Sequence, residues 1–127
     1  MSKVLMSINP IHAEKIFSGT KKFEFRKTQC NKHIEAIVIY VTSPIMKVLG
    51  EVRVRNVIEG PPNVVWEKTR MAAGIDLSFF NRYFEGRNKA VAYELGDITI
   101  FSKPKLLRDY GLKAAPQSYV YIKEGST

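Results

Sequence analysis

The first third of the chain changes from an alternating pattern to a helical one. Residues 4–8 alternate strongly and weakly apolar positions, which predicts a short strand with one well-buried face. Asn9-Pro10 then predicts a helix start, because asparagine caps helices well and proline is accommodated in the first turn. Gly19 is expected to end that helix. Its predicted apolar stripe comprises Ile11, Ala13, Ile16 and Phe17, and its predicted water-facing side comprises His12, Glu14 and Lys15.

A second alternating segment follows the helix. It predicts a strand with Phe23 and Phe25 on one face. The opposite face would then carry a row of three charges, namely Lys22, Glu24 and Arg26. Residues 27–33 are polar and predict a loop, whereas residues 34–41 are almost continuously apolar and predict a buried strand. Thr42-Ser43-Pro44 predicts a turn at its end, because proline favours turn positions.

The rest of the chain predicts further strands and short helical segments. We expect strands over residues 48–55, 89–95, 98–101 and 119–122, and helical segments over residues 64–70, after Asp76 and over residues 104–110. Gly60-Pro61-Pro62 is expected to break the first of these strands, and Gly96-Asp97 to join the next two as a hairpin. The order is not an alternation of strand and helix, so we predict an α+β domain built on a small mixed sheet or barrel.

Length and charge add a bias toward a polyanionic partner. The 127 residues are enough for one core and contain no linker or repeat, so we expect a single domain over residues 1–127. The 20 lysines and arginines against 12 acidic residues give a net charge of +8, which favours a phosphate-rich partner. The same charge is ordinary for a small soluble domain, so composition alone leaves both interpretations open.

The remaining composition narrows the possible chemistry. Cys30 is the single cysteine, which excludes a disulfide within the chain and a cysteine-rich zinc site, and fits a reducing compartment. His12 and His33 lie far apart without matching ligands, so no metal or other cofactor is expected. No apolar run approaches the ~20 residues of a membrane span, and the N-terminus lacks a signal-peptide pattern. We therefore expect a cytoplasmic protein without a membrane partner.

The segment from Gly19 to Arg26 is the most specific feature of the sequence. A helix that ends at glycine and a strand that follows would place Lys21 or Lys22, Glu24 and Arg26 close together. Two cations would keep the carboxylate ionised while offering donors to a phosphate or a carbonyl oxygen. The alternative is a solvated row of charges on an exposed strand, which would contribute little.

This segment resembles the signature of the ASCH domain family, Gly-x-Lys-x-x-Glu-x-Arg, at all four specified positions: Gly19, Lys21, Glu24 and Arg26. As in that family, it follows an N-terminal strand and helix. The resemblance implies a PUA-like fold, a small β-barrel of about six strands flanked by short helices, with a cleft beside the motif. It also implies binding of RNA or nucleotides, with roles in translation, RNA processing or transcriptional coactivation.

Some small family members remove the acetyl group from N4-acetylcytidine with a lysine, a threonine and a glutamate. Lys21 matches that lysine, but Glu24 stands where the threonine would be. Ala73-Gly74 falls at the place of the glutamate, and Glu67 is the nearest candidate upstream. A lysine nucleophile or base also needs a lowered pKa, which a neighbouring Glu24 opposes. A binding role therefore fits the motif better than this hydrolysis.

Other residues are candidates for the same cleft. The turn residues Thr42 and Ser43 could line it, Arg53 and Arg55 could follow a phosphate backbone, and Gln117 could read a base edge. The aromatic candidates for base stacking, against the alternative of core or rim positions, are Trp66, Tyr83, Tyr119 and Tyr121. Cys30 is expected to be a bystander.

Two functional hypotheses follow. The leading one is a module that binds RNA or a modified nucleoside through the motif, the Thr42-Ser43 turn and the residues around them. The alternative is a metal-independent hydrolase, either a nucleoside amidohydrolase or a ribonuclease, with Lys21 and Glu24 as the working pair.

Overall fold

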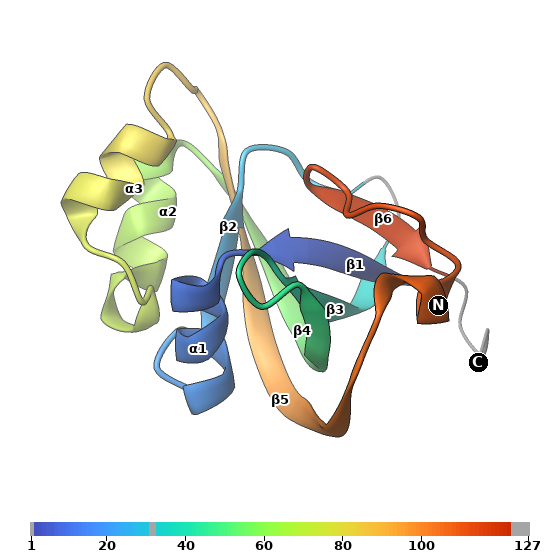
Figure 1. The fold of residues 1–127 in the computed structure, drawn as a ribbon. Helices are drawn as coiled ribbons and strands as arrows, with labels where there is room; N and C mark the ends of the chain where they lie inside the picture. Colours follow the sequence, from blue (N-terminus) through green and yellow to red (C-terminus); the bar gives the residue numbers. More distant parts are fainter. Residues whose placement is uncertain (1, 31–32, 123–127) are drawn as a thin grey trace.

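The fold is one mixed sheet flanked by short helices, as an α+β assignment requires (Figure 1). The computed structural model describes residues 2–30 and 33–122. Its elements are β1 (Ser2–Ile8), α1 (Pro10–Ser18), β2 (Phe23–Arg26), β3 (Ile34–Val41), β4 (Lys47–Gly60), α2 (Pro62–Thr69), α3 (Leu77–Tyr83), β5 (Ala90–Lys105) and β6 (Tyr119–Ile122), with short 3₁₀ turns at Arg70–Ala72 and Leu107–Tyr110. The strand order is β2-β5-β4-β3-β1-β6. Only β1 and β3 run parallel among these paired strands.

Helix α1 begins and ends where the sequence predicts, but it is rotated from the predicted orientation. The side chain of Asn9 accepts a hydrogen bond from the His12 backbone N–H at 3.2 Å, and Gly19 ends the helix in the left-handed conformation. The helix buries Ala13 and Ile16, and His12 lies one turn before Ile16 on nearly the same face. His12 is therefore half-buried, and Ile11 is 64% exposed. The prediction was wrong at both positions.

The predicted Gly96-Asp97 hairpin was also wrong, because β5 continues through both residues as one long strand. Long-range pairing with β4 along most of its length outweighs the local turn signal. Gly96 instead allows close approach of a cross-strand side chain, since a Cβ there would lie 2.6 Å from Cγ of Arg55. Glycine at this position is thus needed for packing between strands rather than for a turn.

The sheet is open, so the predicted closed barrel is not formed. Strands β2 and β6 are its edges, and no backbone pairing joins them within the described residues. The side chain of Arg26 on β2 bridges the gap instead. It donates to the backbone oxygen of Ser7 on β1 and to the hydroxyl of Ser118 just before β6, both at 3.2 Å.

Apolar clusters on both faces and at one end of the sheet hold these elements together. Helix α1 packs Ala13 and Ile16 onto one face of β1 and β3, and residues around the 3₁₀ turn Leu107–Tyr110 cover the other face. Helices α2 and α3 lie together over the end formed by β2 and β5 (Figure 1). Because β3 is covered on both faces, all eight of its residues are buried.

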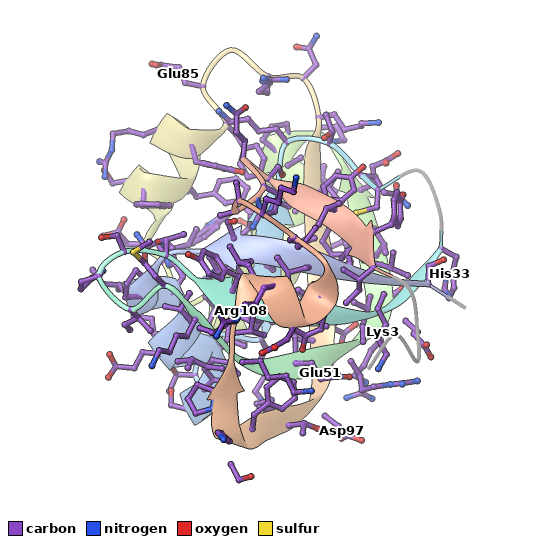
Figure 2. All side chains as sticks on the ribbon, turned by 45° about the vertical axis from the view of Figure 1, so that its right-hand side comes forward. Lys3, His33, Glu51, Glu85, Asp97 and Arg108 are labelled. Atoms are coloured by element: carbon purple, nitrogen blue, oxygen red, sulfur yellow. The ribbon has the colours of Figure 1, made fainter. Side chains whose placement is uncertain are left out.

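Charged side chains lie mostly on the outside of this arrangement. Lys3 on β1 and Glu51 on β4 form an ion pair of 3.2 Å that crosses over β3 (Figure 2). Within residues 2–30 and 33–122, no helix is long and apolar enough to cross a bilayer. The same residues hold no cluster of three or more histidine, cysteine, aspartate or glutamate side chains suited to a metal ion.

Candidate functional site

A cavity of about 160 Å³ lies where the end of β1, the start of α1, β2 and α3 meet. Its lining combines the charged motif with apolar and aromatic side chains: Ser7, Ile8, Asn9, His12, Lys21, Glu24, Phe25, Arg26, Ile75, Phe79 and Tyr83. Three of the four motif residues are therefore brought together at one concave, solvent-reachable place. Such a cavity, apolar with a few convergent polar groups, is typical of a ligand site.

Lys21 is held rigidly at the base of this cavity. It is only 3% exposed, and its ammonium group donates to the carbonyl oxygen of Ala73 at 2.8 Å. The same nitrogen lies 4.8 Å from the ring centroid of Phe25, in a cation–π contact. Gly74 packs against the lysine stem, where a Cβ would lie 2.5 Å from that of Lys21. The position of this charge is thus set by the fold.

Burial changes the acidity of Lys21. It lowers the pKa of the ammonium to about 8, Glu24 opposes this, and Lys15 adds to it. Glu24 acts in the direction expected from the sequence, but the pKa falls because the cost of burying the charge outweighs the ion-pair attraction. At pH 7 the side chain remains mostly protonated, with roughly a tenth of the molecules neutral.

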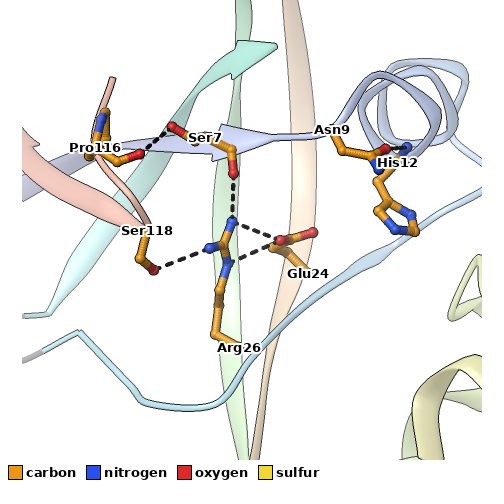
Figure 3. Close-up of polar contacts among 7 residues, drawn as sticks. All are labelled: Ser7, Asn9, His12, Glu24, Arg26, Pro116 and Ser118. Carbon is orange, nitrogen blue, oxygen red and sulfur yellow. Dashed lines mark hydrogen bonds and ion pairs between the residues drawn. The ribbon is translucent and has the colours of Figure 1, made fainter. Parts of the chain in front are cut away.

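Glu24 and Arg26 form a tight, largely buried pair beside Lys21. The Oε2 atom of Glu24 accepts from Nε of Arg26 at 3.1 Å and from its terminal nitrogen at 3.0 Å (Figure 3). Only 10% of the Glu24 side chain and 14% of the Arg26 side chain are exposed. Of the three charged residues predicted to share one strand face, Glu24 and Arg26 are therefore largely buried. Lys22 is the exposed one, and it does not line the cavity.

His12 is the functional candidate that the sequence pattern placed wrongly. Its ring lines the cavity, and its Nδ1 atom is buried without a hydrogen-bond partner in the described part of the chain. The ring also meets Phe79 edge to face, with centroids 5.3 Å apart. Burial, then the charge of Lys21, lowers the pKa of the imidazole. A neutral imidazole with a nitrogen that lacks a partner can donate a hydrogen bond to a ligand or accept one from it.

The predicted turn residues lie near the cavity without lining it. Thr42 donates its backbone N–H to the oxygen of Ile8 at 3.0 Å, because β1 and β3 are parallel and end at the same edge. Thr42 and Ser43 are nevertheless outside the lining, and so is the exposed Gln117. Its neighbour Ser118 contacts the site through Arg26.

The other predicted binding residues lie elsewhere. Arg53 on β4 pairs with Glu35 at 3.4 Å, and the stem of Arg55 packs against Gly96. Tyr119 is half-buried against the core that contains Cys30. The basic face of β4 is thus a separate surface from the cavity.

In the described part of the chain, no glutamate stands where the resemblance to the N4-acetylcytidine hydrolases would place their second catalytic acid. Ala73 and Gly74 hold Lys21 in place instead, and Glu67 is 71% exposed on its side chain and paired with Arg70 at 3.4 Å. Among the described residues, Glu24 is the one carboxylate in the cavity lining. Tyr83 lines the cavity, whereas Trp66 packs against Phe80.

Sequence comparison relates the chain to proteins that carry different names. No family model matches it. It is 32% identical over 96 residues to an ASCH domain-containing ribonuclease of Zymomonas mobilis, covering 75% of this chain and 65% of that protein. It is 28% identical to ATP synthase subunit alpha and 29% identical to large ribosomal subunit protein uL22 of Ureaplasma parvum, over 94% of this chain in each case. The chain spans only 15% and 39% of those two proteins.

Structural comparison gives a likeness over the whole domain. The crystal structure of ASCH from Zymomonas mobilis superposes with a TM-score of 0.88 at 27% sequence identity. The match covers 98% of this chain and 90% of that one. The chain therefore shares its overall fold with that protein.

Proposed function

Because the chain belongs to the ASCH domain family, we propose that it binds RNA through a nucleotide unit that enters the cavity beside Lys21. The observation that carries the proposal is the convergence of Lys21, Glu24 and His12 on one cavity with aromatic walls. A cation for phosphate, acceptors for base or ribose donors and rings for stacking are what recognition of an unpaired nucleotide requires.

Each polar group of the cavity has a distinct part in this proposal. Within the described part of the chain, the Lys21 ammonium donates one hydrogen bond, to the backbone oxygen of Ala73, and keeps further N–H donors for a phosphate. Glu24 receives both Arg26 bonds on Oε2, which leaves Oε1 to accept from an amine or a hydroxyl of the ligand. Arg26, whose nitrogens are engaged by Glu24, Ser7 and Ser118, orients the carboxylate rather than binding phosphate.

Replacement of neighbouring lysines tests the proposal. Binding of a fluorescent single-stranded RNA is measured by anisotropy for Lys21→Met, which keeps the buried stem, and for Lys22→Met as the matched control outside the cavity. We expect Lys21→Met to weaken binding about tenfold. The slope of the logarithm of affinity against the logarithm of salt concentration should become shallower by about one. Lys22→Met should change the affinity far less. Equal effects of the two substitutions would reject the cavity as the binding site.

A second candidate function is cleavage of the bound RNA. It is favoured by two groups on the same cavity, a lysine whose pKa is about 8 and a histidine whose pKa is lowered toward the neutral form. A neutral group can take the proton of a ribose 2′-hydroxyl as its oxygen attacks the adjacent phosphorus. The bond from phosphorus to the 5′-oxygen breaks, and that oxygen takes up a proton from water. A protonated Lys21 would stabilise the added negative charge.

Incubation of end-labelled single-stranded RNA with excess chelator tests this second candidate. We expect the native protein to yield fragments that end in a 2′,3′-cyclic phosphate, and His12→Gln and Lys21→Met to yield far fewer. RNA that stays intact with native protein, at concentrations that saturate binding, would leave binding as the function.

We add two proposals to the RNA-binding function, one on the fold superfamily and one on the location in the cell. The sheet with its short helices supports a PUA-like assignment, even though the described strands remain open. Cys30, the single cysteine, is buried and supports a reducing compartment, so we place the protein in the cytoplasm. Separation of cell extracts into cytoplasmic and membrane fractions, followed by immunodetection, tests that location.

A further inference from the structure

A second hollow adjoins the cavity between the facing sides of α1 and α3. This α1–α3 groove has a volume of about 290 Å³ and is lined by Asn9, Ile11, His12, Lys15, Ile75, Asp76, Phe79 and Arg82. Four of these residues also line the cavity, namely Asn9, His12, Ile75 and Phe79. The two hollows therefore adjoin, and the edge-to-face pair of His12 and Phe79 forms part of the wall that they share.

We propose that the α1–α3 groove binds the nucleotide next to the one in the cavity, so that the ligand is a single-stranded RNA of two or more nucleotides. The proposal rests on the RNA-binding function above, which it deepens by distinguishing an oligonucleotide from a free nucleoside. A free nucleoside would occupy the cavity and leave the adjoining groove empty. An RNA chain that passes over the shared wall would contact both hollows.

The charges of the groove suit a phosphodiester. Lys15 comes from α1, where its ammonium donates to the carbonyl oxygen of Gly74 at 2.9 Å. Arg82 comes from α3, where one terminal nitrogen donates to the hydroxyl of Ser78 at 2.7 Å. Both cations keep further N–H donors. Asp76 is the acid in this lining, and its Oδ1 already accepts the backbone N–H of Phe79 at 2.8 Å as a helix cap.

The apolar residues of the groove suit a stacked base. Phe79 is 37% exposed, and the guanidinium carbon of Arg82 lies 5.9 Å from its ring centroid. Ile11 is 64% exposed on the facing helix, although folding alone favours burying such a side chain. A base placed between them would cover both apolar surfaces, and stacking on an aromatic ring accepts any base.

Ligand length, measured against two variants, tests this inference. Competition with a fluorescent RNA gives the affinities of a mononucleotide and of a trinucleotide of the same base for each protein. Arg82→Ala removes an exposed charge of the groove. Arg108→Ala is the matched exposed control, outside the groove lining on the 3₁₀ turn Leu107–Tyr110. Ile11→Ser removes the apolar wall on the other helix.

We expect native protein to bind the trinucleotide more tightly than the mononucleotide. Arg82→Ala and Ile11→Ser should each weaken trinucleotide binding about three- to tenfold and leave mononucleotide binding unchanged. Arg108→Ala should change neither. The proposal that the groove binds a second nucleotide would be overturned if native protein bound both ligands with equal affinity. It would also be overturned if Arg82→Ala weakened the binding of both ligands equally.

Failure of the underlying function gives a different pattern. Suppose that Lys21→Met weakens the binding of both ligands, whereas Arg82→Ala and Ile11→Ser weaken the binding of neither. In that case only the role of the groove is rejected. If Lys21→Met leaves both affinities unchanged, or native protein binds neither ligand, the RNA function of the cavity fails and the groove proposal with it.

Discussion

Lys21 owes its position to Gly74, fifty-three residues later in the chain. Gly74 has a φ of +72°, and it lies so close to the lysine that a Cβ would be 2.5 Å from Cβ of Lys21 and 2.6 Å from its Cγ. Because no side chain intervenes, the carbonyl oxygen of Ala73 reaches the ammonium group at 2.8 Å. One glycine thus fixes both the stem and the charge at the base of the cavity.

Substitution of Gly74 should therefore damage binding more than stability alone explains. Gly86 is the matched control, because it has a similar φ of +75° but no atom within 4 Å of its Cβ direction. We expect Gly74→Ala and Gly86→Ala both to lose on the order of 1–2 kcal/mol of unfolding free energy from the left-handed backbone. Gly74→Ala should lose more, because its Cβ would also clash with Lys21. Only Gly74→Ala should also weaken RNA binding, as measured by anisotropy below its melting temperature. Similar RNA affinities of the two variants would show that Gly74 does not position the binding site.

The pair of Glu24 and Arg26 should contribute far more to stability than an exposed pair. Glu24→Gln leaves the Arg26 charge largely buried without its counter-ion, so we expect a loss of about 1–3 kcal/mol in urea denaturation. Glu67→Gln makes the same change in a pair whose side chains are 71% and 54% exposed, and should cost less than about 0.5 kcal/mol. Equal losses would mean that the Glu24 pair is solvated in solution.

RNA affinity should decrease with pH in a way that depends on Lys21. The pKa of about 8 means that this ammonium is mostly charged at pH 7 and loses its proton as the pH rises through 8. Binding of a phosphate favours the charged form, so affinity should be nearly constant below pH 7 and fall up to about tenfold between pH 7 and 9. Lys21→Met should lack this step. An equally steep fall in the variant would assign the titration to another group.

The local features of the site were predictable because they depend on neighbouring residues. Asn9 and Gly19 set the two ends of α1 through capping. The alternating pattern placed Glu24 and Arg26 on one strand, with Lys21 just before it. The apolar run of β3 likewise predicted a buried strand. In each case the controlling interactions lie within about one helical turn or one strand.

The remaining features depend on contacts between distant parts of the chain. The cavity needs Phe79 from α3 to face His12 from α1, sixty-seven residues earlier, and the rotation of α1 that buries His12 is set by its packing on β1 and β3. The burial of Lys21 likewise needs Gly74. The local pattern of apolar residues carries no information about contacts between residues far apart in the sequence. It therefore predicted that His12 faces water and that Ile11 is buried.

The most direct test of the central claim is where RNA contacts the protein. A ¹⁵N–¹H NMR titration with a short single-stranded RNA should shift the amide signals of His12, Lys21 and Phe79 most strongly, because these residues line the cavity. The amides of Arg53 and Arg55 on β4 should move little. Shifts confined to the β4 face, with the cavity signals unchanged, would contradict the account.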